Sequence, residues 1–98
     1  MKVSIKGSGS YIPPLITPNE AFNSHAFLQE NGQVFEQENG VIIEKFKAIT
    51  GIENRRYAPD HLNTSDLGFL AAQDAITDAN IDPETIDYII FGHNFGDV

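Results

Sequence analysis

The alternation of hydrophobic and polar positions predicts a strand near the start of the chain. Within residues 3–10, apolar side chains such as Val3 and Ile5 are separated by polar ones. A period of two is typical of strands, because successive side chains point to opposite faces. The pair Pro13-Pro14 would end both a helix and a strand ladder. We therefore predict a first strand over residues 3–10.

A second strand is predicted near the other end of the sequence. Tyr88, Ile89, Ile90, Phe91 and Gly92 form a continuous apolar run. Such runs are found in strands that are covered on both faces. Residues 52–58 indicate only a short extended piece.

A helix is predicted after Gly40, from about residue 41 to residue 50. Ile42, Phe46 and Ile49 recur at spacings of four and three, which places them on one helical face. Gly51 stands where a left-handed residue usually ends a helix.

A longer helix is predicted over residues 64–79. Asn63 or Thr64 can cap its first turn, Asp66 lies near the positive end of its dipole, and Asn80 can end it in the left-handed conformation. Small residues on a wide apolar face predict close burial of this Ala-rich helix against a sheet. Its two apolar stripes are Leu67, Leu70, Ala71 and Ala75, and Phe69, Ala72, Ile76 and Ala79.

Shorter signals fill the intervals between these elements. Thr17 and Pro18 are residue types that begin helices, so we expect a short helix that extends to about residue 27 or 28. The Asn-Gly pairs at 31–32 and 39–40 are typical of turns. Asp82-Pro83-Glu84 indicates one further helical turn.

These elements predict an α/β fold class with an incomplete sheet. Two strands do not make an independently stable sheet, so more partners are required. We therefore interpret residues 1–98 as part of a longer domain or as a chain that must associate with another.

Composition and charge exclude several classes of function. The chain has 14 acidic and 6 basic residues and a formal net charge of −8, which opposes binding to nucleic acid and to anionic membranes. No apolar run approaches the roughly 20 residues of a membrane span, and the opening residues turn polar too early for a secretory segment. We expect a cytoplasmic protein. With no cysteine and three dispersed histidines, we expect no metal site, no disulfide and no cofactor.

Three motifs in order give the chain a resemblance to a known family. They are TGIENRRY at residues 50–57, TSDLGFLAA at residues 64–72 and IDPETIDYII at residues 81–90. The sequence resembles the start of a ketoacyl synthase III, a condensing enzyme of the thiolase superfamily. The resemblance implies that residues 1–98 are an incomplete amino-terminal portion of a thiolase-like fold, with a mixed sheet and the Ala-rich helix buried in it.

The resemblance also implies a reaction for the complete enzyme. Such enzymes are acyltransferases that join an acyl-CoA primer to malonyl-ACP, the malonyl group carried on acyl carrier protein, to start fatty-acid or polyketide-type synthesis. A cysteine thiolate takes the acyl group, and a histidine and an asparagine stabilise the oxyanion and the enolate. In the family all three lie beyond the matched segment, so no catalytic residue is assigned here and the segment alone is expected to be inactive. The complete enzyme is expected to be a homodimer.

Three basic residues are candidates for contacts with substrate or carrier protein. In the best-known bacterial members of the family, a tryptophan and an arginine that bind CoA precede the Thr-Gly-Ile motif. This chain has Lys45 and Ile49 near those places, so adenine stacking of that type is lost. Arg55 and Arg56, with Lys45, can face CoA phosphates or an acidic carrier, although ion pairing or solvation is the commoner role of such residues.

Other motifs have an ordinary interpretation beside a functional one. Residues 7–9, Gly-Ser-Gly, suggest a dinucleotide loop, but the prolines that follow favour a tight structural turn. His93 and Asp97 can line a pocket after the last strand, and an ordinary loop role is favoured. Asp74 and Asp78 are interpreted as a solvated helix face. Three phenylalanines are interpreted as core contacts rather than an acyl-binding stripe: Phe22, Phe27 and Phe46.

Two other functions stay open at this stage. One is a hydroxymethylglutaryl-CoA synthase-like enzyme, which shares the cysteine but condenses acetyl units by an aldol-type step. The other is a non-catalytic binding or assembly domain, which is consistent with the missing cysteine.

Overall fold

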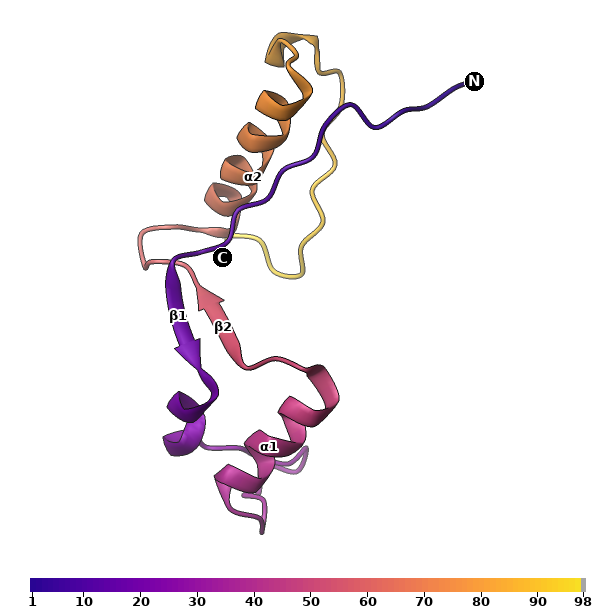
Figure 1. The fold of residues 1–98 in the computed structure, drawn as a ribbon. Coiled ribbons are helices and arrows are strands. Elements are labelled where there is room, and N and C mark those ends of the chain that lie inside the picture. Colours follow the sequence, from indigo (N-terminus) through magenta and orange to yellow (C-terminus); the bar gives the residue numbers. More distant parts are fainter. Residues whose placement is uncertain (98) are drawn as a thin grey trace. The chain divides into compact units, whose positions relative to one another are not determined.

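The chain is organised as two compact units. A computed structural model describes residues 1–97. Pro14–Tyr57 forms one unit, called here the middle unit, and residues 1–13 with the described residues from Ala58 onward form the terminal unit. The middle unit contains β1 (Leu15–Pro18), the 3-10 helix η1 (Asn19–Ser24), α1 (Asn39–Thr50) and β2 (Asn54–Tyr57); the terminal unit contains α2 (Thr64–Ala79) and η2 (Pro83–Thr85) (Figure 1).

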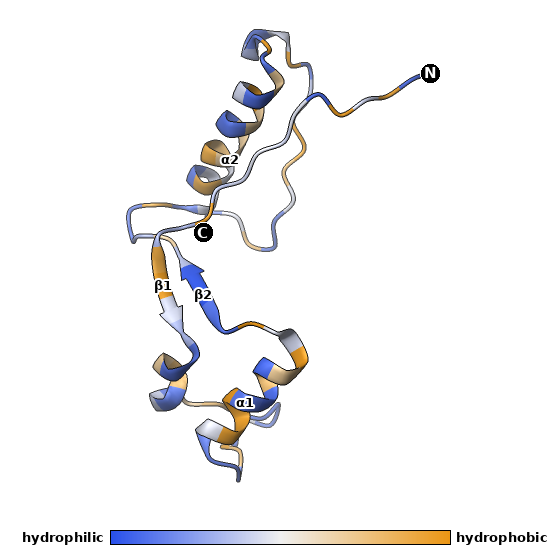
Figure 2. Cartoon of the chain, in the orientation of Figure 1, coloured by the Kyte–Doolittle hydropathy of each residue, from blue (hydrophilic) through white to orange (hydrophobic). Residues whose placement is uncertain are grey.

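The two strands of the middle unit form an antiparallel pair. Leu15 lies opposite Tyr57, and Pro18 lies opposite Asn54. β1 is hydrophobic at its start and near neutral toward its end, whereas β2 is hydrophilic (Figure 2). The extended piece predicted around β2 is confirmed. The helix predicted from Thr17 is wrong in its start and in its length, because Thr17 and Pro18 belong to β1 and only the short η1 follows.

The helix predicted after Gly40 is confirmed as α1, but of its predicted apolar face only Ile42 is buried, while Ile49 is 80% exposed. Gly51 ends it in the left-handed conformation, with φ of 71°, and donates its N–H to the Lys47 carbonyl at 2.7 Å. The turn predicted at residues 39–40 is wrong, because both residues belong to the first turn of α1. The side-chain amide of Asn39 donates to the carbonyls of Asn23 and His25, both at 2.7 Å, and so ties the helix start to the preceding loop.

The turn predicted at residues 31–32 is confirmed. Gly32 donates its N–H to the Gln29 carbonyl at 2.9 Å, and an isolated antiparallel bridge joins Leu28 and Val34 on either side.

The helix α2 has the predicted start and end. Asn63 is its cap residue, and Asp66 accepts a hydrogen bond from the Asn63 N–H at 2.8 Å. Asn80 ends the helix in the left-handed conformation. The extra turn predicted at Pro83 is η2, which begins with the Asp82 carboxylate accepting from the Glu84 N–H.

The amino-terminal residues lie along α2 instead of forming a strand (Figure 1). Gly7 and Gly9 face the backbone of α2 so closely that a Cβ on Gly7 would lie 2.6 Å from the Ala79 nitrogen. The strand predicted over residues 3–10 is therefore wrong, since the segment has no ladder partner among residues 1–97. The turn predicted at residues 7–9 is also wrong, because these residues form neither a turn nor a bend.

The strand predicted at Tyr88–Gly92 does not form among the described residues. Tyr88, Ile89 and Ile90 are 85–97% exposed, and no neighbouring strand accompanies them. Phe91 lies against Gly68 of α2. A continuous apolar run needs partners on both sides before it becomes a central strand, and the described chain supplies none.

The buried core of the described chain is small. Among residues 1–97, only Ile42 and Ile43 are buried hydrophobic residues, and both belong to α1. No residue of α2 is buried, so close burial of the Ala-rich helix stays a prediction. Helices and a two-stranded sheet agree with the mixed α/β class. Within residues 1–97, no helix is both long and apolar enough to span a bilayer.

Candidate functional site

A pocket with an apolar interior lies in the middle unit. Its volume is about 150 Å³, and η1, the loop after it, α1 and the entry to β2 all contribute to its wall. The apolar lining residues are Phe22, Phe27, Ile43, Phe46 and Ile52.

The helical period explains why α1 forms one wall of this pocket. Its lining residues, Ile43, Phe46, Lys47 and Thr50, are spaced by three and four and so share a face. The ring of Phe46 meets the ring of Phe27 edge to face, with centroids 5.9 Å apart.

The aromatic cluster continues away from α1. His25 stands between Phe27, with centroids 5.0 Å apart, and Phe22, with centroids 5.9 Å apart. The interpretation of Phe22, Phe27 and Phe46 as core contacts is supported only in part, because their rings belong to one cluster but none is buried and Phe46 is 47% exposed. The same three rings line the pocket.

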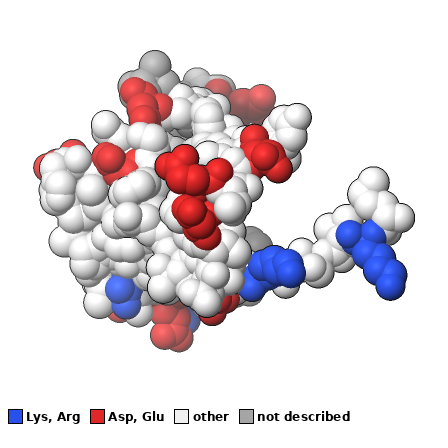
Figure 3. Space-filling model, turned by 90° about the horizontal axis from the view of Figure 1, so that it is seen from above, with Lys and Arg blue, Asp and Glu red and all other residues white. Residues whose placement is uncertain are grey.

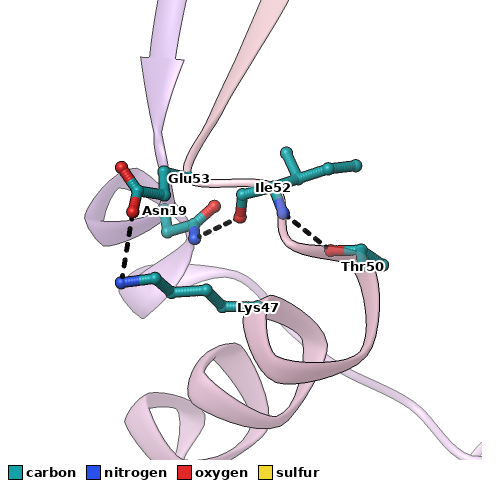
Figure 4. Close-up of polar contacts among 5 residues, drawn as sticks. All are labelled: Asn19, Lys47, Thr50, Ile52 and Glu53. Carbon is teal, nitrogen blue, oxygen red and sulfur yellow. Dashed lines mark hydrogen bonds and ion pairs between the residues drawn. The ribbon is translucent and has the colours of Figure 1, made fainter.

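Most of the polar groups that line the pocket are already bonded (Figure 4). The Asn19 side-chain amide donates to the Ile52 carbonyl at 2.9 Å. The Thr50 hydroxyl donates to the Phe46 carbonyl at 2.8 Å and accepts from the Ile52 N–H at 3.1 Å. The Lys47 ammonium lies 3.7 Å from a Glu53 carboxylate oxygen. These bonds fix the corner where α1 passes into β2.

The three basic residues named from the sequence occupy different places. Arg55 is half-buried and lines the pocket, whereas Arg56 is exposed and follows it on β2. Because side chains alternate along a strand, the two guanidinium groups leave opposite faces of β2. Lys45 is exposed on α1 and is not among the lining residues. The structure therefore brings Arg55 together with Lys47 rather than with Lys45, and the predicted contacts with substrate or carrier protein stay predictions.

Asp97 caps the first turn of α2 in the terminal unit. Its carboxylate accepts from the Ser65 N–H at 2.9 Å, and the Thr64 hydroxyl donates to the Gly96 carbonyl at 3.0 Å. Hydrogen bonding from the Ser65 side chain, followed by that from the Ser65 backbone, lowers the pKa of Asp97, and His93 nearby acts in the same direction. His93 packs on Phe91, with ring centroids 5.3 Å apart. These contacts give Asp97 a structural role, in line with the loop interpretation.

Asp74 and Asp78 have partners that the sequence did not reveal. Asp78 accepts from the Ser8 N–H at 3.0 Å, and Asp74 accepts from the Ser10 N–H at 3.2 Å. Two residues four positions apart on a helix are about as far apart along its axis as two residues two positions apart in an extended segment. The two carboxylates therefore accept hydrogen bonds from residues 8 and 10 as a neighbouring strand would. The signal was present as a Gly-x-Gly pattern together with paired aspartates on a small-residue helix.

Charge and metal-binding groups add no further site. Acidic side chains outnumber basic ones on the face in Figure 3, as the net charge of −8 implies. Across residues 1–97, no three His, Asp or Glu side chains gather closely enough to hold a metal ion.

Sequence comparison relates the chain to named proteins. It is 39% identical over all 98 residues to beta-ketoacyl-(acyl-carrier-protein) synthase III of Staphylococcus haemolyticus strain JCSC1435. It is also 39% identical over 98 residues to the proteins of the same name from Staphylococcus aureus strains Newman and JH1. The chain spans 27% of the length of each of these relatives. No family model matches the chain. The family resemblance noted from the sequence is confirmed.

Proposed function

We propose that this chain, which belongs with the beta-ketoacyl-(acyl-carrier-protein) synthase III-like proteins, supplies the amino-terminal part of a condensing acyltransferase. The supporting observation is a match that covers all 98 residues of the chain but 27% of the relatives. The complete enzyme would be a cytoplasmic homodimer that condenses an acyl-CoA primer with malonyl-ACP. The 98 residues alone would be inactive, since they contain no cysteine to form the acyl thioester.

The surface of the chain supports this proposal independently. Tyr88, Ile89 and Ile90 form an exposed apolar run, and α2 has no buried residue. Contiguous exposed apolar side chains mark surfaces that another segment covers. In the proposed enzyme, further strands would pair with residues 88–91 and bury α2 beneath a mixed, thiolase-like sheet.

In the proposed enzyme, the residues of this chain would support the catalytic residues rather than take part in the reaction. The nucleophilic cysteine, histidine and asparagine would come from the rest of the enzyme, and the chain would hold the helix and the strand on which that part folds. Arg55, Arg56 and Lys45 are proposed contacts for the phosphates of CoA or for the acidic carrier protein, because a cationic side chain forms charge-assisted hydrogen bonds with phosphate and carboxylate groups.

A chimera tests the proposal directly. The matched 98-residue segment of the Staphylococcus haemolyticus relative is replaced by this chain, and condensation of acetyl-CoA with malonyl-ACP is measured. We expect the chimera to be active, with the isolated chain and the relative lacking this segment both inactive. A matched chimera with Ile90→Lys should lose activity through misfolding of the shared sheet.

Other outcomes separate the competing functions. If the chimera condenses acetyl-CoA with acetoacetyl-CoA instead, the hydroxymethylglutaryl-CoA synthase-like assignment replaces this one. If the chimera is inactive while the isolated chain is monomeric, unfolds cooperatively and binds acyl carrier protein, the chain is a binding or assembly domain.

A further inference from the structure

The pocket of the middle unit joins an apolar interior to one unsatisfied cation. Arg55 lines the pocket and is half-buried, and its guanidinium has no hydrogen bond or ion pair within residues 1–97. A guanidinium that is partly removed from water and left unpaired favours an anion.

The other polar lining groups do not compete for that anion. The Asn19 amide and the Thr50 hydroxyl bond to backbone groups, and Lys47 lies beside the Glu53 carboxylate. Glu53 therefore offsets the charge of Lys47, so Arg55 provides the net positive charge of the pocket. One guanidinium matches one carboxylate, since its parallel N–H groups fit the two oxygens.

The apolar interior of the pocket determines which group can accompany the carboxylate in a ligand. Aromatic rings of Phe22, Phe27 and Phe46 and the side chain of Ile43 present hydrocarbon on several sides. A volume of about 150 Å³ is small beside the roughly 300–1,000 Å³ of pockets for drug-sized ligands, so only a short apolar group fits.

We propose that this pocket binds a small amphipathic carboxylate. The short hydrocarbon tail lies among the phenylalanine rings, and the carboxylate pairs with Arg55. The proposal goes beyond the condensing function, because it needs only residues of this chain and no acyl transfer.

The test titrates the 98-residue chain with hexanoate and with hexanamide, its neutral counterpart. Backbone NMR shifts report binding, and circular dichroism confirms that the helices are formed. Hexanoate is expected to shift signals of the lining residues saturably and to bind about tenfold more tightly than hexanamide, as expected for a charged hydrogen bond. Arg55→Gln should weaken hexanoate binding by about tenfold and leave hexanamide binding unchanged.

Arg56→Gln is the matched control, because it removes the same charge from the opposite face of β2. It should change hexanoate affinity less than about twofold, and Arg55→Lys should restore part of the loss. Equal binding of hexanoate and hexanamide would overturn the proposal, and so would shifts outside the middle unit or an equal effect of both arginine substitutions. A chain without helical signal would overturn it too, because these residues would then not form the pocket. None of these readouts depends on condensing activity, so failure here is distinct from failure of the chimera.

Discussion

At the scale of single residues, two glycines determine how the amino-terminal segment lies on α2. A Cβ on Gly9 would meet the Ala75 nitrogen and lie 2.8 Å from the Ala71 carbonyl oxygen. These contacts are with helix backbone, which cannot move aside without breaking its own hydrogen bonds.

Gly9→Ala should therefore detach the segment from α2 and cost about 1–3 kcal/mol of stability in the terminal unit. Hydrogen exchange measures this as lost protection of the Ser8 and Ser10 amides. Gly92→Ala is the control, because a Cβ at Gly92 meets nothing within 4 Å. Equal protection in both variants would contradict the contact.

The Asp97 carboxyl gives a second prediction at this scale. Ser65 hydrogen bonds hold its pKa below the ordinary value of about 3.9. Because the folded pKa is depressed, its stabilising contribution is fully present above the ordinary value and is lost as pH falls through the folded pKa. Carboxyl NMR titration should show a lowered midpoint, and Ser65→Ala should move it back toward the ordinary value. An unchanged midpoint in Ser65→Ala would contradict the assigned cause.

At the scale of elements, the ends of the helices follow local chemistry. The Asp66 carboxylate accepts from the Asn63 N–H at the start of α2. Asp66→Ala should cost about 1 kcal/mol, measured by urea unfolding followed through helical circular dichroism. Gln73→Ala, on an exposed part of the same helix, should cost little, since alanine is a strong helix former. A comparable loss in both variants would remove the cap as the cause.

Predictions were confirmed where nearby residues determine the feature, and they were wrong where the feature needs a partner that is distant in the sequence. The carboxyl end of α1 and both ends of α2 were predictable because Gly51, Asn63 and Asn80 act on their own helix. The strands predicted at residues 3–10 and 88–92 did not form, because a ladder needs a partner, and the N–H groups of Ser8 and Ser10 are bonded to side chains of α2 instead.

The candidate site was only partly predictable for the same reason. Arg55 and the phenylalanines were recognisable as residue types. These side chains line one pocket only because η1, α1 and β2 lie next to one another, and no periodicity in the sequence predicts that arrangement.

At the scale of the whole molecule, the ratio of buried to exposed apolar surface is the main feature. In the part of the chain that the structure describes, Ile42 and Ile43 are the buried hydrophobic residues, while Ile89 and Ile90 are 85% and 97% exposed. A core this small provides little of the stabilisation that offsets chain entropy. We infer that the isolated chain covers its exposed run by association.

The isolated chain should therefore form oligomers as its concentration rises, as measured by analytical ultracentrifugation. Ile90→Lys should shift the distribution toward monomer, because a charge in an exposed apolar run opposes edge pairing. Ile49→Lys, at an 80% exposed position on α1, is the control and should leave the distribution nearly unchanged. If only Ile49→Lys produced monomer, a different surface would be responsible.

The hydrogen bonds from Ser8 and Ser10 to α2 also have a consequence for biosynthesis. Their partners lie 70 and 64 residues later in the chain. A ribosome that adds about 5–20 residues per second needs on the order of 3–14 seconds to deliver Asp74 and Asp78 after these serines. During that interval the Ser8 and Ser10 N–H groups emerge without their carboxylate partners, so the amino-terminal segment can take its place along α2 only after this helix has left the exit tunnel.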